Sequence, residues 1–248
     1  MRARTILGPA MVWAVAMMFA VPAFADDAEP VGTVSVLQGS AKRRGADGDH
    51  GLAVGSAIHL GDVVRVGAGS RLKMTLNDQS VIMLDENSEL TVSVADFDNQ
   101  VRKGFAATLG FGKVWAKVKK AISGSDSKFE VTTDRAVAGV RGTVFRVDIG
   151  TKGTRVRVSQ GKVAVDSRFN AQPQFARATG APKSTPGKRV QVQGPQEITR
   201  QEWEEKFVEL QKGWAVTVGE AGYWQVEPKS PEPQDAFAKF IQAHAGNE

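Results

Sequence analysis

Arg71-Leu72-Lys73-Met74-Thr75-Leu76 is the stretch that indicates the fold class, because polar and apolar residues alternate in it strictly. Successive side chains of an extended strand point to opposite faces, so this pattern places the three apolar side chains on one buried face. Residues 89–94, 113–118 and 155–159 repeat the alternation. Strands that recur about every 8–12 residues, with turn-forming residues between them, predict an all-β sandwich, roll or solenoid rather than an α/β enzyme.

Glycine marks the start of several of these strands. A glycine just before an extended segment lets the backbone turn sharply into the strand. The repetition indicates a solenoid-like stacking of short antiparallel hairpins. Chance matches in a glycine-rich β-protein are the alternative interpretation. Four segments begin with glycine, a polar residue and valine: Gly32-Thr33-Val34, Gly112-Lys113-Val114, Gly142-Thr143-Val144 and Gly161-Lys162-Val163.

Residues 1–25 have the pattern of a secretory signal peptide. Arg2 and Arg4 precede an uncharged, mostly apolar stretch, and Ala23-Phe24-Ala25 supplies the small residues for cleavage after Ala25. The protein is therefore expected to be periplasmic or secreted. An uncleaved membrane anchor is the alternative, because residues 6–25 are 20 uncharged positions, just enough to span a bilayer. A lipoprotein is excluded, since lipidation after export requires a cysteine and the chain has none.

The composition excludes several kinds of chemistry. With no cysteine and three histidines, the chain has no disulfides, thiolate zinc sites, iron–sulfur clusters or cysteine nucleophile, and no cofactor is expected. The formal charge of +5 falls to +3 without the two arginines of residues 1–25. Residues 167–189 hold five basic and no acidic residues, whereas 190–248 hold ten acidic and five basic residues. The basicity is local, and it does not argue for a nucleic-acid partner.

The pattern of short strands covers residues 31–166, and the chain changes character beyond it. Residues 167–189 contain three prolines and are expected to form a basic loop or linker. Residues 190–248 are expected to hold a final strand, with Lys188–Val192 returning to the sheet, followed by an amphipathic helical tail.

Two helices are predicted in this tail. Thr199-Arg200-Gln201-Glu202 is a capping box that would open a helix through about Gln211, with Trp203, Phe207 and Leu210 on its apolar face. A second helix is expected from Asp235 to about Ala245. The aromatic residues of the tail would either dock these helices onto the β-domain or contact a partner.

The sequence contains no recognisable catalytic motif. No nucleophile elbow, P-loop or calcium loop occurs, and His50 and His59 lie in turn-rich or strand-edge segments. The acidic clusters Asp85-Glu86 and Asp96-Phe97-Asp98 have turn-like surroundings. Any β-fold can bring two acids together, so an envelope glycan hydrolase with an unrecognised carboxylate pair stays an alternative to the predicted non-enzyme.

Basic residues on strands suggest a second kind of site. Lys113, Lys117, Lys119 and Lys120 surround Trp115, and Arg155 and Arg157 share one strand face. An aromatic side chain within a basic stripe can bind an anionic polymer. Because export disfavours nucleic acid, an anionic glycan or lipid headgroup would be the ligand. The alternative is that these side chains form the solvated faces of antiparallel strands.

The segment Ala138-Gly139-Val140-Arg141-Gly142-Thr143-Val144-Phe145 resembles the signature of the FecR domain family, the periplasmic domain of iron-dicitrate-type sensors. Neighbouring segments are similar in order, from Gly32-Thr33-Val34 through Leu60-Gly61-Asp62-Val63-Val64 to residues 156–165. The resemblance covers about residues 31–166. One departure is Asn77-Asp78-Gln79-Ser80, where the family usually has Asp-Gly-Ser, and Gln79 is expected to change the turn conformation.

The resemblance implies structural roles for the signature residues Gly139, Arg141, Gly142 and Thr143. Arg141 is expected to pair with a buried acid or with carbonyl oxygens. The two glycines are expected to permit backbone geometry or close strand packing.

Three functions remain open at this point. The favoured one is a free-standing, non-enzymatic binding module of the periplasm or cell envelope, whose partner is an envelope protein or an anionic glycan such as peptidoglycan. No anti-sigma segment is expected, because only about five residues precede the apolar run. The alternatives are the glycan hydrolase and a membrane-anchored signalling regulator, which would apply if the N-terminal segment is retained.

Overall fold

The structure is a computed structural model, and it describes residues 29–120, 127–168, 207–219 and 224–246. The expected signal peptide, nearly all of the expected linker, the strand expected at 188–192 and the capping box at Thr199 lie outside these ranges. None of the helices within the described ranges has the length and hydrophobicity of a membrane span.

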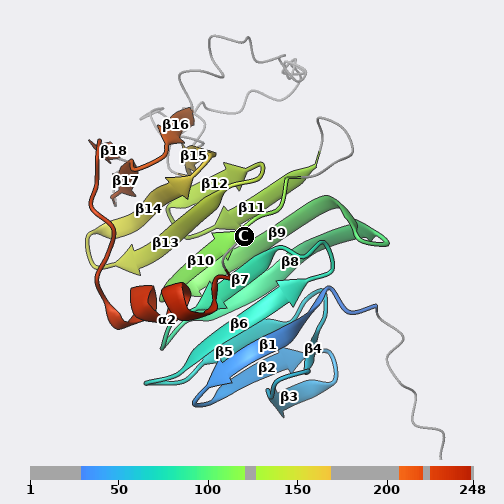
Figure 1. Ribbon diagram of the computed structural model, residues 1–248. Helices are drawn as coiled ribbons and strands as arrows, with labels where there is room; N and C mark the ends of the chain where they lie inside the picture. Colours follow the sequence, from blue (N-terminus) through green and yellow to red (C-terminus); the bar gives the residue numbers. More distant parts are fainter. Residues whose placement is uncertain (1–28, 121–126, 169–206, 220–223, 247–248) are drawn as a thin grey trace, which may run out of the picture.

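Two nine-stranded sheets make up most of the molecule (Figure 1). In spatial order, sheet A consists of β18 (Trp224–Glu227), β17 (Ala215–Val218), β14 (Gly153–Gln160), β13 (Val144–Gly150), β10 (Lys113–Lys117), β7 (Val81–Leu84), β6 (Arg71–Leu76), β1 (Gly32–Gln38) and β4 (Ala57–Ile58). Sheet B consists of β16 (Phe207–Gln211), β15 (Lys162–Ser167), β12 (Ala136–Val140), β11 (Lys128–Thr132), β9 (Val101–Phe111), β8 (Glu89–Asp98), β5 (Val63–Val66), β2 (Ala41–Gly45) and β3 (Gly48–Gly51).

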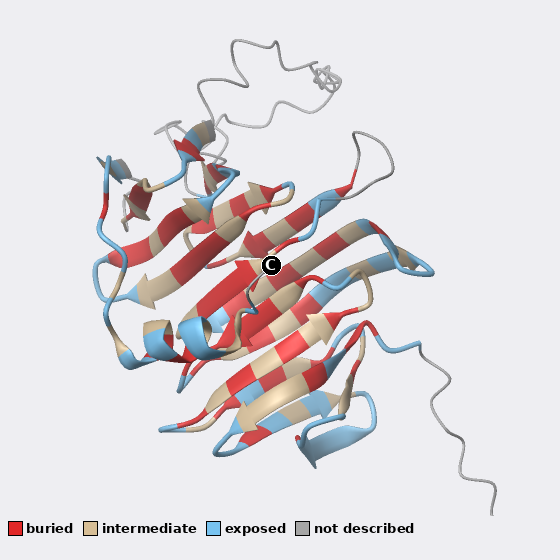
Figure 2. Cartoon of the chain, viewed as in Figure 1, coloured by how far each residue is buried: buried red, intermediate tan, exposed pale blue. Residues whose placement is uncertain are grey.

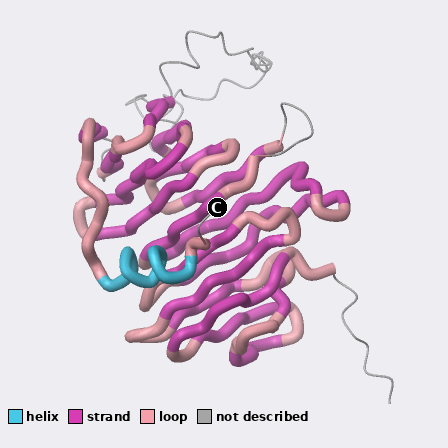
Figure 3. The backbone as a smooth tube through the Cα atoms, viewed as in Figure 1, coloured by secondary structure: helices cyan, strands magenta, loops and turns pink. Residues whose placement is uncertain are grey.

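The chain crosses repeatedly between the two sheets and usually leaves two consecutive strands in each. After β6 and β7 in sheet A, it forms β8 and β9 in sheet B, then β10 alone in sheet A, and from β11 to β18 it again leaves two strands in each sheet in turn. Figure 3 shows how much of the chain is strand, with short loops between. Strands within these hairpins run antiparallel, whereas β9 and β11 are parallel neighbours. The predicted mostly-β, solenoid-like sandwich is therefore confirmed.

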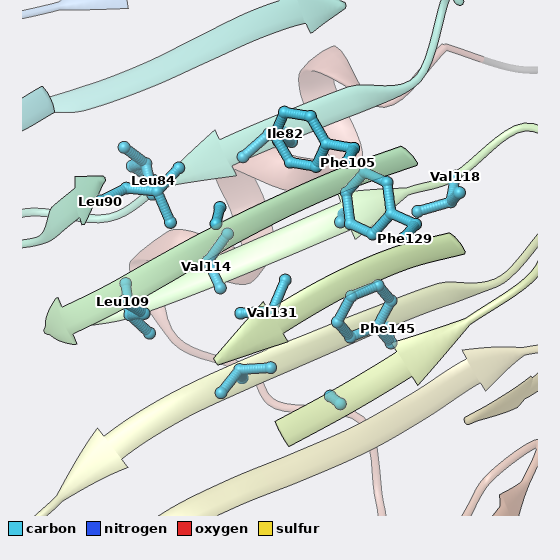
Figure 4. Packing of buried hydrophobic residues seen from close by; sticks show 14 of the residues in the cluster. Ile82, Leu84, Leu90, Phe105, Leu109, Val114, Val118, Phe129, Val131 and Phe145 are labelled. Atoms are coloured by element: carbon cyan, nitrogen blue, oxygen red, sulfur yellow. The ribbon is translucent and has the colours of Figure 1, made fainter. Parts of the chain in front are cut away.

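The hydrophobic core lies between the sheets. Buried residues alternate with more exposed ones along most strands, as Figure 2 shows. In β6 the three apolar residues of the alternating stretch are the buried ones, each at most 1% exposed. Aromatic rings fill the centre (Figure 4): Phe105 stacks on Phe129 with centroids 4.8 Å apart, and Phe129 meets Phe145 edge-on at 6.3 Å.

A buried ion pair links the β6–β7 turn to sheet B. The side chain of Arg102 is 1% exposed and that of Asp78 is 7% exposed. Arg102 donates to the Asp78 carboxylate and, at 3.0 Å, to the Ser80 hydroxyl. Gln79 adopts φ +65°, the left-handed conformation that glycine favours. The turn therefore keeps this conformation although glutamine stands in it.

The prediction of a helix through about Gln211 is wrong for residues 207–211, the part of it that the structure describes. Phe207–Gln211 forms β16, which pairs antiparallel with β15, and Leu210 opposite Val163 is fully buried. The apolar spacing fits a helix, but β15 offers an unpaired edge, and strand pairing there outweighs helix propensity. Strands β16 to β18 extend both sheets, so the β-structure continues beyond Asp166.

The second expected helix is confirmed as α2 (Ala236–His244). Asp235 caps its N-terminus by accepting a hydrogen bond from the amide of Ala238. Phe237 and Phe240 are its buried residues, and they face the outer surface of sheet A.

Candidate binding surface

The two sheets differ in what covers their outer faces. Helix α2 lies across sheet A (Figure 1), where Phe237 and Phe240 cluster with Met83 and Trp115. Trp115 is therefore 6% exposed, and it is not available to an anionic polymer as the basic stripe suggested. Lys113 from the same stripe pairs with Asp85, Nζ to Oδ2 at 3.0 Å.

Sheet B carries a hollow of about 580 Å³ on its outer face. Its floor is a row of residues that face one another across four strands: Glu130 pairs with Gly139, Gly139 with Ala164, and Ala164 with Glu209. Three strand spacings separate the two glutamates, about 14 Å between backbones. The two small residues between them create the depression.

Three basic residues border the hollow at one end. Lys128 begins β11, Lys162 begins β15, and Arg141 directly follows β12. Lys162 pairs with Glu209, Nζ to Oε1 at 2.7 Å. Arg141 is exposed, and within the described part of the chain neither it nor Lys128 has an ion pair. The expected pairing of Arg141 with a buried acid is not present there.

The two signature positions Gly139 and Gly142 differ in whether the fold requires a glycine there. Gly142 has φ +65°, and a Cβ added to it would lie 2.9 Å from the Lys120 Cβ, so the fold requires glycine there. Gly139 has no such conformation, and an added Cβ would meet its nearest atom, the Ala164 carbonyl oxygen, at an ordinary 3.9 Å. The fold does not require glycine at 139; what the missing side chain does is keep the hollow open.

Thr143, the fourth signature residue, is buried and structural in position. Its hydroxyl donates a 2.8 Å hydrogen bond to the Lys162 carbonyl oxygen, and it is 1% exposed. This bond holds the loop after β12 against the start of β15. Of the four named signature residues, Gly139 and Arg141 line the hollow, and Gly142 and Thr143 lie beside it.

Several of the acidic and histidine candidates are engaged in other contacts. Asp85 is buried between Arg71 and Lys113, and Asp98 pairs with Lys103 on the surface. The Nδ1 atom of His59 lies 3.7 Å from the Oδ2 atom of Asp62. No group of three or more potential metal ligands occurs among the residues that the structure describes.

Sequence reasoning missed the rest of the hollow. The described residues that line it are Lys128, Phe129, Glu130, Val137, Gly139, Val140, Arg141, Gly161, Lys162, Ala164 and Glu209. The register between β11, β12, β15 and β16 brings these positions together, and no local pattern signals it.

The architecture is that of a two-sheet β-protein with one sheet face covered by a helix and one hollowed. Residues 62–164 match the family model described as FecR protein, so this part of the chain is a FecR domain, as the signature at 138–145 implied. Strands β1 to β4 and β16 to β18 lie outside the match. No curated protein is similar enough to this chain to be matched to it.

Solved structures of distant similarity exist. Two crystal structures, at 1.65 Å and 2.50 Å resolution, are of a protein described as a "putative anti-sigma factor" from Parabacteroides distasonis ATCC 8503. Each is 17% identical to this chain, with a TM-score of 0.44, and the alignment covers 67% of this chain. The chain spans 59% of the length of that protein.

Proposed function

We propose that this chain is an exported, non-enzymatic FecR-domain protein of the cell envelope, which binds a protein partner through the hollow on sheet B. The observation that carries the proposal is Gly139: the backbone tolerates a side chain at this position, yet a glycine keeps the surface concave. Concave surfaces with a few convergent polar groups are the usual form of binding sites. The family assignment supports a sensor-type role, and residues 1–25 support export.

A protein ligand fits the hollow better than a glycan. Of the described lining residues the one aromatic, Phe129, is fully buried, so no aromatic ring is offered to a sugar. The floor and wall offer small apolar area at Gly139, Ala164 and Val137. Arg141 and Lys128 supply cationic groups that have no carboxylate partner among the described residues. A protein segment with an apolar side chain beside an acidic one would satisfy both features.

Substitution of Gly139 separates binding from folding. Gly139→Val places an isopropyl side chain on the floor of the hollow and suits a strand, and we expect the free energy of unfolding to stay within about 1 kcal/mol of the natural value. Gly51→Val is the matched control, because Gly51 lies in β3 at the opposite edge of sheet B and has no atom within 4 Å of an added Cβ.

The experiment uses each chain as bait in envelope extracts and compares the captured proteins quantitatively. The proposal expects a partner that the natural chain and Gly51→Val retain and that Gly139→Val loses. Equal capture by all three chains, with all three folded, would show that the hollow is not the contact site.

N-terminal sequencing of the cellular product tests export: a start at Asp26 supports the free-standing form, and an intact N-terminus supports a membrane-anchored regulator.

A further inference from the structure

The C-terminal segment, residues 227–246, follows the outer face of sheet A and ends in α2 (Figure 1). Three arginines of sheet A face this segment. Arg146 in β13 is the register partner of Arg157 in β14, and Arg155 lies two residues before Arg157 on the same face. We refer to these three residues as the arginine face.

Two of the three arginines receive carboxylates from the C-terminal segment. Arg155 binds Glu227 with both terminal nitrogens, and Arg146 binds Asp235 with Nη1–Oδ1 and Nη2–Oδ2 distances of 3.1 and 2.6 Å. The Arg146 guanidinium also lies over the Phe237 ring, 5.1 Å from its centroid. These are paired, planar contacts of the kind that arginine makes with carboxylates.

Arg157 lies next to Arg146 and Arg155, but within the described residues no carboxylate binds it in the way that Glu227 and Asp235 bind those two. It is 6% exposed, it donates Nη1 to the backbone carbonyl of Pro231, and its Nε is buried without a hydrogen-bond partner. The neighbouring Glu232 instead accepts a hydrogen bond from Ser159. Within the described residues Arg157 has no ion pair. Burial, and then the charge of Arg155, lower the pKa of Arg157.

A buried guanidinium without a bound carboxylate is costly, because its desolvation is offset only in part: the charges of Glu232 and Asp148 raise the pKa of Arg157, but neither forms an ion pair with it. The segment therefore fits the arginine face incompletely: it presents a neutral carbonyl where an acidic side chain would fit better. Pro231 supplies that carbonyl, so residue 231 is the position at which an acidic side chain is introduced to test the fit.

The segment can also leave without disturbing the sheets. Residues 228–246 follow the last strand, so their release unpairs no strand of either sheet. Helix α2 has nine residues, too few to be stable without its docking surface. The Glu227–Arg155 pair stays in place on this release because Glu227 belongs to β18, and Asp235 keeps 37% of its side-chain surface exposed, so its ion pair with Arg146 stabilises the docked state modestly.

We propose that the arginine face and the adjoining Met83–Trp115 surface form a docking site for an acidic segment of a partner protein, one that places a carboxylate opposite Arg157 and continues into a short helix with two aromatic residues. The chain's own C-terminal segment occupies this site when the partner is absent. The site is separate from the hollow on sheet B, and it stands whether or not that hollow binds a ligand.

Two synthetic peptides test the proposal in solution. One has the natural sequence of residues 225–246 and the other carries Pro231→Glu, both with a fluorophore for anisotropy. The receptor is the full chain with Asp235→Ala, which loosens its own segment. We expect the Pro231→Glu peptide to bind about tenfold or more tightly than the natural peptide, as a charged hydrogen bond to Arg157 predicts. The unsubstituted chain should bind both peptides more weakly, because its site is occupied.

Arg157→Met in the same receptor is the control, because an apolar side chain of similar size is tolerated where a buried charge is removed. This substitution should abolish the difference between the peptides and leave binding of the natural peptide. Equal affinities for the two peptides before that substitution, or a difference that persists after it, would overturn the proposal.

A second measurement does not depend on Asp235→Ala. Pro231→Glu in the otherwise natural full chain should slow hydrogen exchange of the α2 amides about tenfold or more, because the segment would then match all three arginines. Unchanged or faster exchange would contradict the inference that Arg157 lacks its carboxylate.

Discussion

Removal of the Asp78 carboxylate is expected to be the most damaging single change outside the apolar core. Asp78→Ala leaves Arg102, 1% exposed, with the Ser80 hydroxyl, the Lys119 carbonyl oxygen and the face of Phe129 as its remaining partners. Breaking a buried pair by removing one member typically costs about 3–5 kcal/mol, because the other charge stays buried. Loss of the carboxylate also removes the acceptor for both the amide and the hydroxyl of Ser80. We therefore expect a loss in the upper part of this range.

Urea denaturation followed by circular dichroism measures the effect. For an m-value of about 2 kcal/mol/M, the midpoint should fall by roughly 2 M. A double-mutant cycle with Arg102→Met isolates the pair, and the double variant should be more stable than Asp78→Ala alone, because it no longer buries an uncompensated charge. A loss below about 1 kcal/mol for Asp78→Ala, or no coupling in the cycle, would refute the reasoning.

Three further predictions concern other parts of the fold. Gly153→Ala should cost more than about 2 kcal/mol in urea denaturation, because Gly153 has φ +134° and an added Cβ would lie 2.1 Å from the Val218 carbonyl oxygen. Phe237→Ala should release α2 and speed exchange of its amides while the sheet amides keep their protection. The Arg146 guanidinium holds the pKa of Asp235 at about 2 rather than 3.8, so the stability that Asp235 contributes should be fully present above about pH 4 and lost as the pH falls through 2, which hydrogen exchange of α2 against pH would show.

Local alternation predicted much of the fold, because a period of two follows from strand geometry alone. Leu72, Met74 and Leu76 are buried as the alternation in β6 required. Helix α2 was equally predictable from its cap and its spaced aromatics. Strand β16 was not, because the apolar spacing of residues 207–211 fits a helix and the deciding contact is with the edge of β15, far away in sequence.

The candidate site was also predictable from the sequence only in part. Gly139 and Arg141 were singled out by their resemblance to a family signature, without any indication that one keeps a hollow open and the other is exposed. Glu130 and Glu209 became candidates through the register of three strand pairs, which no local pattern encodes. The incomplete match at Arg157 depends on the path of a segment more than 70 residues away, since the Arg157 guanidinium donates its hydrogen bond to the carbonyl oxygen of Pro231.

Photo-crosslinking in living cells is the most direct test that the hollow on sheet B is a partner site. A photo-reactive amino acid at Ala164, in the floor of the hollow, is compared with the same amino acid at Gly51 in β3. The proposed function predicts a discrete protein adduct from position 164 that is absent from position 51. No adduct from 164, or the same adducts from both positions, would contradict it.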